Sequence, residues 1–340
     1  MKKIFIIFFI LAVVTGSFFI GGCSKSSNSD KKVDIFFPAG MERWEKSGQQ
    51  FKTELEKQGF KVNLLFAKTA DEQSKQVENA IKDKANCVVI GAVDSKTIGK
   101  ALEKAKKNNI PIIAYDRLPM NTNAVSYYAT FDNEGIGIAM GKYIVNKYNL
   151  KSGAGPYTIE FFQGADDDNN AHIINKGVMS VLKPYMDDGQ LVVPSGQIDF
   201  KATNTPEWSP QNAAKRMEKL VAQYYGTRNL DIVLSASDSV TDGVIQGLMN
   251  AGYSGSWPFI TGQDATKKNL AYVEQGKQGF TILKSADLIN SKCIRMVKAV
   301  IDGSQLEIND VKTYNNGVIT VPSYLCIPLI IDKNNIAQVH

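Results

Sequence analysis

The stretch VVIGAVDSKTIG, residues 88–99, has a counterpart in IVLSASDSVTDG, residues 232–243. In both, a run of apolar residues is followed by the pattern Asp-Ser-x-Thr-x-Gly. Two further pairs of stretches match in the same order along the chain: PIIAYD (111–116) with PFITGQD (258–264), and more weakly IFFPAGMERW (35–44) with EFFQGADDDN (160–169). One such match could arise by chance, but three in the same order indicate that the chain contains two similar halves.

Each half alternates short, continuously apolar runs with segments of helical periodicity. CVVIGA, residues 87–92, is one such run, and Ile98, Leu102 and Ala105 in the next segment follow the spacing of a helix face. Continuous apolar runs are typical of parallel strands that are buried on both faces. Because strands that alternate with helices indicate βαβ units, we predict an α/β protein with two lobes, each built on a parallel sheet.

The N-terminal segment has the features of an export signal. MKK precedes the apolar run IFIIFFILAVV, and small residues follow before Cys23. The run is shorter than the roughly 20 residues of a spanning helix, which favours a cleaved signal peptide over residues 1–22. IGGC, residues 20–23, resembles the bacterial lipoprotein box, so we expect a lipid on Cys23 and a polar tether over residues 23–32. A plain secretory signal with an incidental cysteine is the alternative.

Composition argues against several functional classes. Without the signal peptide the chain has 37 basic and 34 acidic residues, a balance too even to indicate a nucleic-acid partner. The other cysteines, Cys87, Cys293 and Cys326, are odd in number and lack metal-ligand spacing, and there are only two histidines. We therefore expect buried thiols, no metal site and no cofactor.

Polar and aromatic side chains follow the predicted strands of both halves. Ligands of open parallel sheets bind beyond the carboxyl ends of the strands, so two facing lobes would place these residues in one cleft. They are Arg43, Trp44, Asp94, Asp116 and Arg117 in the first half, and Asp168, Asn170, Trp208, Asp238, Asp264 and Lys284 in the second. Carboxylates, amides and cations supply the donors and acceptors that sugar hydroxyls need, and a tryptophan ring suits the apolar face of a pyranose. An amino-acid ligand is the alternative.

Several of these residues also have a purely structural interpretation. Asp168 and Asp238 precede helices, where an aspartate caps free N–H groups. Lys284 could be a surface lysine at a strand end, and Trp208 could pack against the helix that follows it. The acidic run over residues 166–168 lacks the spacing of a calcium-binding EF-hand loop, so we expect a solvated loop there.

Eight motifs carry a more specific signal: RW (43–44), PIIAYDRL (111–118), VSYYATFDN (125–133), IEFF to DDNNA (159–171), VMSVLKPY (178–185), SGQ (195–197), SGSWPFITGQDA (254–265) and KTYNNGV to VPSYL (312–325). Together they resemble the bacterial ABC-importer monosaccharide-binding proteins, above all the multiple-sugar-binding receptor and the xylose-binding protein. The resemblance spans residues 33–333 and implies the type I periplasmic-binding-protein fold, with two Rossmann-like lobes joined by a three-segment hinge. It implies a first lobe of residues 33–130 and 286–318, and a second lobe of residues 131–285 and 319–340.

The resemblance also implies which residues contact the sugar. Arg43 would follow the first strand with Trp44 beside it as a stacking face, and Asp116 and Arg117 would be paired ligands of hydroxyl groups. Further contacts are implied for the residues in matching motifs: Glu160, Asn170, Asp264 and Lys284. The chain departs from these relatives just before Asp238 and over residues 198–208, which include Trp208, so the choice of sugar stays open.

These features predict an extracytoplasmic lipoprotein, anchored to the cell membrane or periplasmic. It would be a monomer that captures a monosaccharide of the xylose, arabinose, glucose or galactose type and delivers it to an ABC permease. A sugar-sensing role with a chemoreceptor or sensor kinase is the alternative. An enzyme such as a glycosidase, with Asp116 and Asp264 as its carboxylate pair, is disfavoured because neighbouring cations would lower their pKa values. A sugar-responsive repressor would need a DNA-binding helix-turn-helix where the export signal stands.

Overall fold

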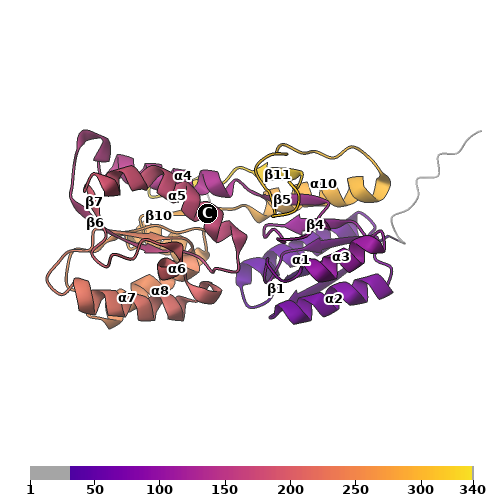
Figure 1. Cartoon of the computed structure of the whole chain (residues 1–340), viewed down its shortest axis with the longest axis horizontal. Helices are drawn as coiled ribbons and strands as arrows, with labels where there is room; N and C mark the ends of the chain where they lie inside the picture. The colour runs from indigo at the N-terminus through magenta and orange to yellow at the C-terminus, as the bar shows by residue number, and fades with distance from the viewer. Residues whose placement is uncertain (1–30, 339–340) are drawn as a thin grey trace, which may run out of the picture.

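The computed structural model describes residues 31–338, which form two lobes that lie side by side along the long axis of the molecule (Figure 1). The predicted signal peptide, Cys23 and most of the predicted tether lie outside these residues. Within residues 31–338, none of the helices has the length and apolar character needed to cross a membrane.

The first lobe is built on a six-stranded parallel sheet in the order β11-β5-β4-β3-β1-β2. Its strands are β1 (Lys32–Pro38), β2 (Lys61–Ala67), β3 (Cys87–Ile90), β4 (Ile112–Tyr115), β5 (Tyr127–Phe131) and β11 (Ser323–Cys326). One face is covered by α1 (Glu42–Lys57) and α10 (Ala286–Asp302), and the other by α2 (Ala70–Lys82) and α3 (Gly99–Lys107). The sheet is therefore the middle of three layers.

The second lobe has a four-stranded parallel sheet in the order β7-β6-β8-β9, and β10 and β12 form an antiparallel pair beside it. The strands are β6 (Tyr157–Phe162), β7 (Leu191–Val192), β8 (Ile232–Ser235), β9 (Phe259–Ile260), β10 (Phe280–Leu283) and β12 (Leu329–Asp332). The longer helices are α4 (Asn133–Lys147), α5 (Asn169–Asp187), α7 (Pro210–Tyr224), α8 (Asp238–Asn250) and α9 (Lys267–Gln275). Short helical segments are η2 (Leu150–Ser152), α6 (Phe200–Thr203), η3 (Pro206–Trp208) and η4 (Ile336–Gln338). Helices α4 and α5 pack on one face of the sheet, and α7 and α8 on the other.

The strand interiors are buried on both faces. In β1, Ile35 and Phe37 join the apolar layer with α1, whereas Phe36 between them joins the layer with α2. Successive residues of a strand point to opposite faces, so a sheet covered by helices on both sides needs apolar residues at every position. This confirms the α/β architecture with parallel sheets that the sequence predicts.

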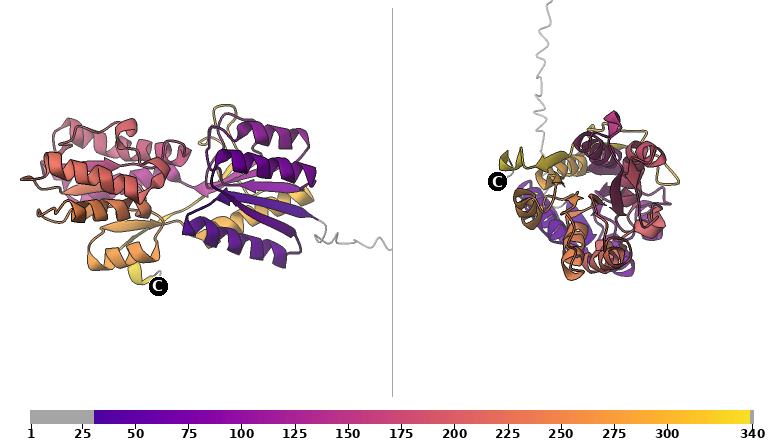
Figure 2. Two further views of the ribbon diagram at one scale, coloured as in Figure 1. Left: turned by 90° about the horizontal axis from the view of Figure 1, so that it is seen from below. Right: turned by 90° about the vertical axis from the view of Figure 1, so that its left-hand side faces the viewer.

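The chain passes between the lobes three times, and Figure 2 shows these connections between the two bodies. The first passage joins β5 to α4 at Asp132, and the second joins β10 to α10 at residues 284–285. The third lies at residues 327–328, between β11 and β12, and not near residue 318 as predicted. Residues 319–326 belong to the first lobe because β11 pairs in parallel with β5, from Ser323 opposite Tyr128 to Cys326 opposite Phe131.

Close packing of α4 on α5 fixes one wall of the region between the lobes. A Cβ atom on Gly137 would overlap the carbonyl oxygen of Ile174, so only glycine permits this approach of the two helices. The first turns of the two helices then meet, and Asn133 Nδ2 donates to Asn170 Oδ1 over 3.0 Å. Asn170 thereby lies next to the loop that follows β4, where its Nδ2 donates to Asp116 O.

Candidate functional site

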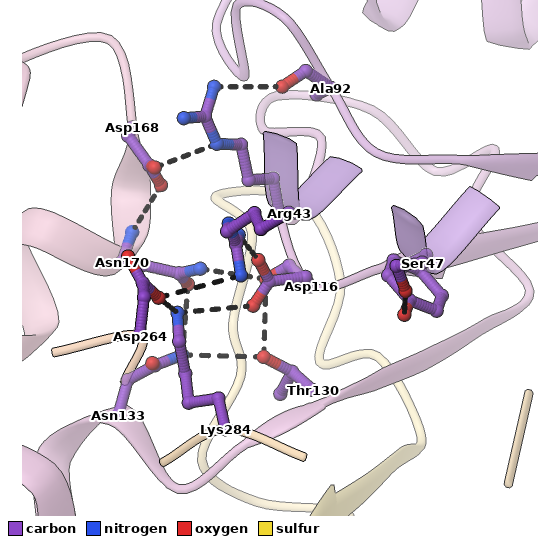
Figure 3. A network of polar contacts seen from close by, with 12 residues as sticks. Arg43, Ser47, Ala92, Asp116, Thr130, Asn133, Asp168, Asn170, Asp264 and Lys284 are labelled. Atoms are coloured by element: carbon purple, nitrogen blue, oxygen red, sulfur yellow. Dashed lines mark hydrogen bonds and ion pairs between the residues drawn. The ribbon is translucent and has the colours of Figure 1, made fainter. Parts of the chain in front are cut away.

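The carboxyl ends of the strands in the two lobes face each other, and charged side chains from both lobes meet between them (Figure 3). Arg43 lies in the first turn of α1, directly after β1, and Asp116 and Arg117 follow β4. From the second lobe come Asp168 before α5, Asp264 after β9 and Lys284 after β10. This arrangement is the cleft that the repeated strand–helix pattern predicts.

Four of these side chains form one ion-pair cluster. Arg43 donates a hydrogen bond to Asp116 Oδ2, and its Nη1 lies 3.7 Å from Asp264 Oδ1. Lys284 Nζ lies 3.3 Å from Asp264 Oδ1 and 3.9 Å from Asp116 Oδ1. Burial alone would raise the pKa of Asp116, but the positive charges of Arg43, Lys284 and Arg117 lower it to about 2. The Asp116 carboxylate is therefore ionised throughout the physiological pH range. The side chain of Lys284 is only 5% exposed, so Lys284 is not a surface lysine.

The backbone aims both aspartates into the cleft. Asp116 has φ +58° and Asp264 has φ +102°, in the left-handed region that few residues other than glycine and asparagine or aspartate adopt. The Asp116 carbonyl oxygen accepts hydrogen bonds from Tyr128 Oη at 2.5 Å, Thr130 Oγ1 at 3.1 Å and Asn170 Nδ2 at 2.7 Å. Three buried donors therefore hold this unusual turn in place, and Asn170 contributes from the other lobe.

A second ion pair joins the lobes beside the first cluster. Arg117 Nε lies 2.8 Å from Asp168 Oδ2, and both side chains are buried. The other carboxylate oxygen of Asp168 accepts from Asn170 N over 3.0 Å and caps α5. Asp168 therefore fits both interpretations: one carboxylate oxygen caps α5, and the other takes part in the ion pair at the cleft.

Two small cavities, of about 30 and 50 Å³, adjoin the cluster, and both are lined by Arg43, Asp116, Asp264 and Lys284. Each has room for a few water molecules at most. A pyranose would therefore need the side chains that line these cavities to move or the lobes to separate.

Trp208 lies in the wall of the smaller cavity and closes the site from the second lobe. Its ring covers Gly164 so closely that a Cβ atom at that position would overlap it. The buried indole Nε1 has no hydrogen-bond partner among residues 31–338. An aromatic face with a free donor is the kind of platform that the sequence predicts for a sugar ring.

Trp44 occupies a different position from the one expected. It is 1% exposed and packs among Phe37 and Tyr115, with ring centroids 5.1 and 6.0 Å away. The guanidinium carbon of Arg43 lies 4.5 Å from the centroid of its ring. Trp44 borders the larger cavity but supports Arg43 by this cation–π contact, so it does not offer an open stacking face.

Glu160 lies away from both cavities. It belongs to the interior of β6, on the face covered by α7, and its carboxylate accepts from Tyr225 Oη and Ser195 Oγ, both at 2.7 Å. Ser195 N donates to it as well, over 3.2 Å. The expectation of a sugar contact at Glu160 is not met because the side chain points into the helix layer, two residues before the strand ends.

Asp238 is likewise turned away from the cleft. Its carboxylate accepts from Gln278 Nε2 at 3.0 Å, Thr281 Oγ1 at 2.9 Å and Thr266 N at 2.8 Å. Burial raises the pKa of Asp238 to about 7, although these hydrogen bonds favour the charged form. Asp238 therefore ties α8 to the segment around α9 and β10, which corrects the prediction of a sugar ligand.

Several residues that line the smaller cavity were not predicted: Met41, Ile174, Ser237, Ser239 and Gln263. Three of them are sequence neighbours of predicted site residues, so they could have been identified from the sequence. Gln263 directly precedes Asp264, and Ser237 and Ser239 flank Asp238 in the repeated motif. Within residues 31–338 the structure contains no group of His, Cys, Asp and Glu side chains that could hold a metal ion.

Two α/β lobes that enclose a cleft of paired charges define a protein that binds a small polar molecule between its lobes. Residues 35–305 match the family model described as the periplasmic binding protein domain, and the chain belongs to this family. This confirms the family that the motifs suggested.

Similar proteins match this chain over most of its length. The multiple sugar-binding periplasmic receptor ChvE of Rhizobium radiobacter is 39% identical over 301 residues, covering 87% of this chain and 85% of the relative. The multiple sugar-binding periplasmic protein SbpA of Azospirillum brasilense is 38% identical over 297 residues, with 86% and 83% covered. An ABC transporter solute-binding protein of Clostridium phytofermentans, solved with bound β-D-glucose, has a TM-score of 0.89 at 40% identity, covering 91% of this chain and 96% of its own.

Proposed function

We propose that this protein captures a neutral monosaccharide between its lobes and delivers it to an ABC permease outside the cytoplasm. The observation that carries the proposal is the balanced charge of the cleft: the cations Arg43, Arg117 and Lys284 pair with the carboxylates Asp116, Asp168 and Asp264. A site with equal numbers of both charges has no net preference for an anion or a cation. It does offer charge-assisted donors and acceptors to a ligand rich in hydroxyl groups.

The mechanism follows from the pairing. With the lobes apart, the ion pairs that join the lobes are broken and their charged groups face water. When the lobes close on a sugar, its hydroxyls accept from the cations and donate to the carboxylates, and water is excluded. The hinge at Asp132 and at residues 284–285 and 327–328 would carry this motion. The relatives that are named multiple sugar-binding proteins, and the glucose in the Clostridium phytofermentans protein, support a hexose or pentose as ligand.

Isothermal titration with D-glucose, D-galactose, D-xylose, L-arabinose and D-ribose tests this proposal, with D-glucuronate as the charged control. We expect micromolar or tighter binding to at least one of the neutral sugars. D-Glucuronate should bind more weakly than D-glucose because an added carboxylate would stand beside Asp116 or Asp264 without a matching cation. Absence of binding to all the neutral sugars would refute the proposal.

We also propose that the protein does not transform the sugar. A general acid needs a carboxyl group whose pKa lies near the working pH, whereas the neighbouring cations lower the pKa of Asp116 to about 2 despite its burial. Incubation with chromogenic glycosides should therefore release no more product than a buffer control. Release that disappears in Asp116→Asn would contradict this.

Anchoring is a separate proposal that rests on the sequence. The lipoprotein box at residues 20–23 favours a diacylglyceryl group on Cys23, which would hold a monomer at the membrane surface near the permease. Intact-mass analysis of the membrane-extracted protein would show a lipidated N-terminal Cys23. A mature chain without lipid would leave a freely diffusing binding protein. A role in presenting the sugar to a chemoreceptor or sensor kinase would use the same closed form and stays the alternative.

A further inference from the structure

The acidic run between β6 and α5 reaches across to the first lobe at each of its three residues. Asp166 Oδ2 lies 2.9 Å from Lys96 Nζ, and Asp167 O accepts a hydrogen bond from Ser95 N over 3.2 Å. Asp168 forms the buried ion pair with Arg117 described above. Asp166 and Asp167 are exposed, as expected for a solvated loop, but the run also forms a contact between the lobes.

Only the Asp168 pair belongs to the sugar cavity. The side chains of Lys96 and Asp166 are 51% and 60% exposed and lie outside the lining of both cavities. Lys96 and Ser95 stand in the turn between β3 and α3, where Asp94 accepts hydrogen bonds from Lys96 N at 2.8 Å and Thr97 Oγ1 at 2.8 Å. The turn is thus held from within its own lobe and presents Ser95 N and Lys96 to the acidic run.

The partner side of the contact is also held in place. His172 Nε2 lies 3.4 Å from Asp166 Oδ1 and 3.0 Å from Asp166 O, and its ring stacks on Phe200 with centroids 4.0 Å apart. These contacts stay within the second lobe. They fix the position of the Asp166 carboxylate, which reduces the entropy lost when the ion pair to Lys96 forms.

We infer that Ser95, Lys96, Asp166 and Asp167 form a latch that holds the lobes closed and so sets sugar affinity without touching the sugar. The inference rests on the proposed function. Contacts between residues of different lobes exist only in the closed form, so they lower the free energy of closing. Sugar binding includes that closing step. The latch therefore increases the affinity for every sugar by the same factor.

The expected size follows from the exposure of the pair. Exposed ion pairs contribute little, which for Lys96→Met corresponds to a loss of about 1.5- to 5-fold in affinity. The loss should appear mainly as faster dissociation, since opening precedes release. Lys96→Glu places a carboxylate opposite Asp166 and should cost about tenfold, and both effects should shrink at high salt.

The chain offers a matched control in Lys104, which pairs with Glu78 at 2.6 Å on the surface of the first lobe, with exposed fractions of 61% and 42%. The variants are Lys96→Met, Lys96→Glu, Asp166→Asn, the double variant Lys96→Met with Asp166→Asn, and Lys104→Met. Each is titrated with D-glucose and D-xylose, and dissociation is followed by stopped flow. Small-angle X-ray scattering of the sugar-free variants reports the opening of the lobes independently of any sugar.

If the latch exists, Lys96→Met and Asp166→Asn should each lower the affinities for both sugars by the same factor. The double variant should show no further loss of affinity, and Lys104→Met should bind both sugars as the unmodified protein does. The latch also predicts a larger radius of gyration for sugar-free Lys96→Glu than for Lys104→Met. Equal affinities and equal radii for the Lys96 and Lys104 variants would overturn it, as would a change in the ratio of the two affinities, which would mean that Lys96 contacts the sugar. If the unmodified protein binds neither sugar, the proposed function fails while the scattering comparison still decides the latch.

Discussion

Replacing Asp116 by asparagine removes one carboxylate from the middle of the ion-pair cluster and leaves its shape almost intact. Asparagine is also one of the few residues that adopts the left-handed backbone of this position, at φ +58°. Alanine there would add backbone strain to the loss of charge. Asp116→Asn therefore isolates the carboxylate, and it leaves Arg43 and Lys284 to share the remaining carboxylate of Asp264.

The structure allows the size of two effects to be worked out. The pKa of Asp116 is lowered from 3.8 to about 2, so the carboxylate favours the folded state by roughly 2 kcal/mol at neutral pH. This stabilisation is present above pH 4 and is lost as the pH falls toward 2. Hydrogen bonds to charged groups contribute about 1.5–3 kcal/mol, so the loss of a charged acceptor for a sugar hydroxyl should weaken binding at least about tenfold.

Calorimetric titration with the best-bound sugar and urea denaturation at neutral pH measure both effects on the same preparation. Asp187→Asn is a suitable control because Asp187 is an exposed carboxylate that pairs with Lys183, one helical turn away, at 2.7 Å. Its affinity and stability should match those of the unmodified protein. If Asp116→Asn lost stability but bound sugar within twofold of the unmodified protein, Asp116 would be a structural residue and the site assignment would be wrong.

Three further substitutions separate the sugar site from its surroundings. Glu160→Gln should lower the free energy of unfolding by about 1–3 kcal/mol, because Tyr225 loses a charged acceptor, and leave sugar affinity within twofold in the same titration. Gly164→Ala should displace the Trp208 ring and weaken sugar binding about 2- to 10-fold with little change in the urea midpoint; unchanged affinity would remove Trp208 from the site. Burial raises the pKa of Asp238 from 3.8 to about 7. The contribution of this group to the free energy of unfolding should therefore be greatest below pH 4 and fall by a few kcal/mol as the pH rises to 7. Urea unfolding at several pH values should show this slope flattened in Asp238→Asn, and an unaltered slope would assign it to other groups.

The repeat in the sequence predicts the two sheets because buried parallel strands leave a plain signal of continuous apolar runs. The strand β11, Ser323–Cys326, shows why the third passage between the lobes was misplaced. Four residues of mixed polarity carry no information about which sheet they join. Only the pairing with β5 decides that, and this pairing depends on Tyr314 and Val321 being buried in the first lobe ahead of the strand.

The sequence predicts those residues of the candidate site whose place at the end of a strand brings them to the cleft. Asp116 and Asp264 follow strands at equivalent places in the two halves, so the topology alone brings them to the cleft. Glu160 lies in a stretch that resembles a motif of sugar-binding proteins, yet the direction of its side chain is set by the alternation of side chains along β6. The sequence marked Asp166 as part of an acidic loop but did not indicate its pairing with Lys96, because Lys96 stands in the other half of the chain.

The proposed use of six charged groups to hold an uncharged sugar would link the sugar site to the latch. A buried charge without a partner destabilises a protein by much more free energy than a buried ion pair stabilises it. Each charged group of the cleft must therefore be paired with a correctly placed hydroxyl group or with another charged group. A sugar with a misplaced hydroxyl would leave Asp116 or Arg43 poorly paired and be rejected. Selectivity therefore comes from the cleft, whereas Lys96 and Asp166 act on the closing step that all sugars share. Asp116→Asn should change the ratio of affinities for D-glucose and D-xylose, and Lys96→Met should leave that ratio unchanged.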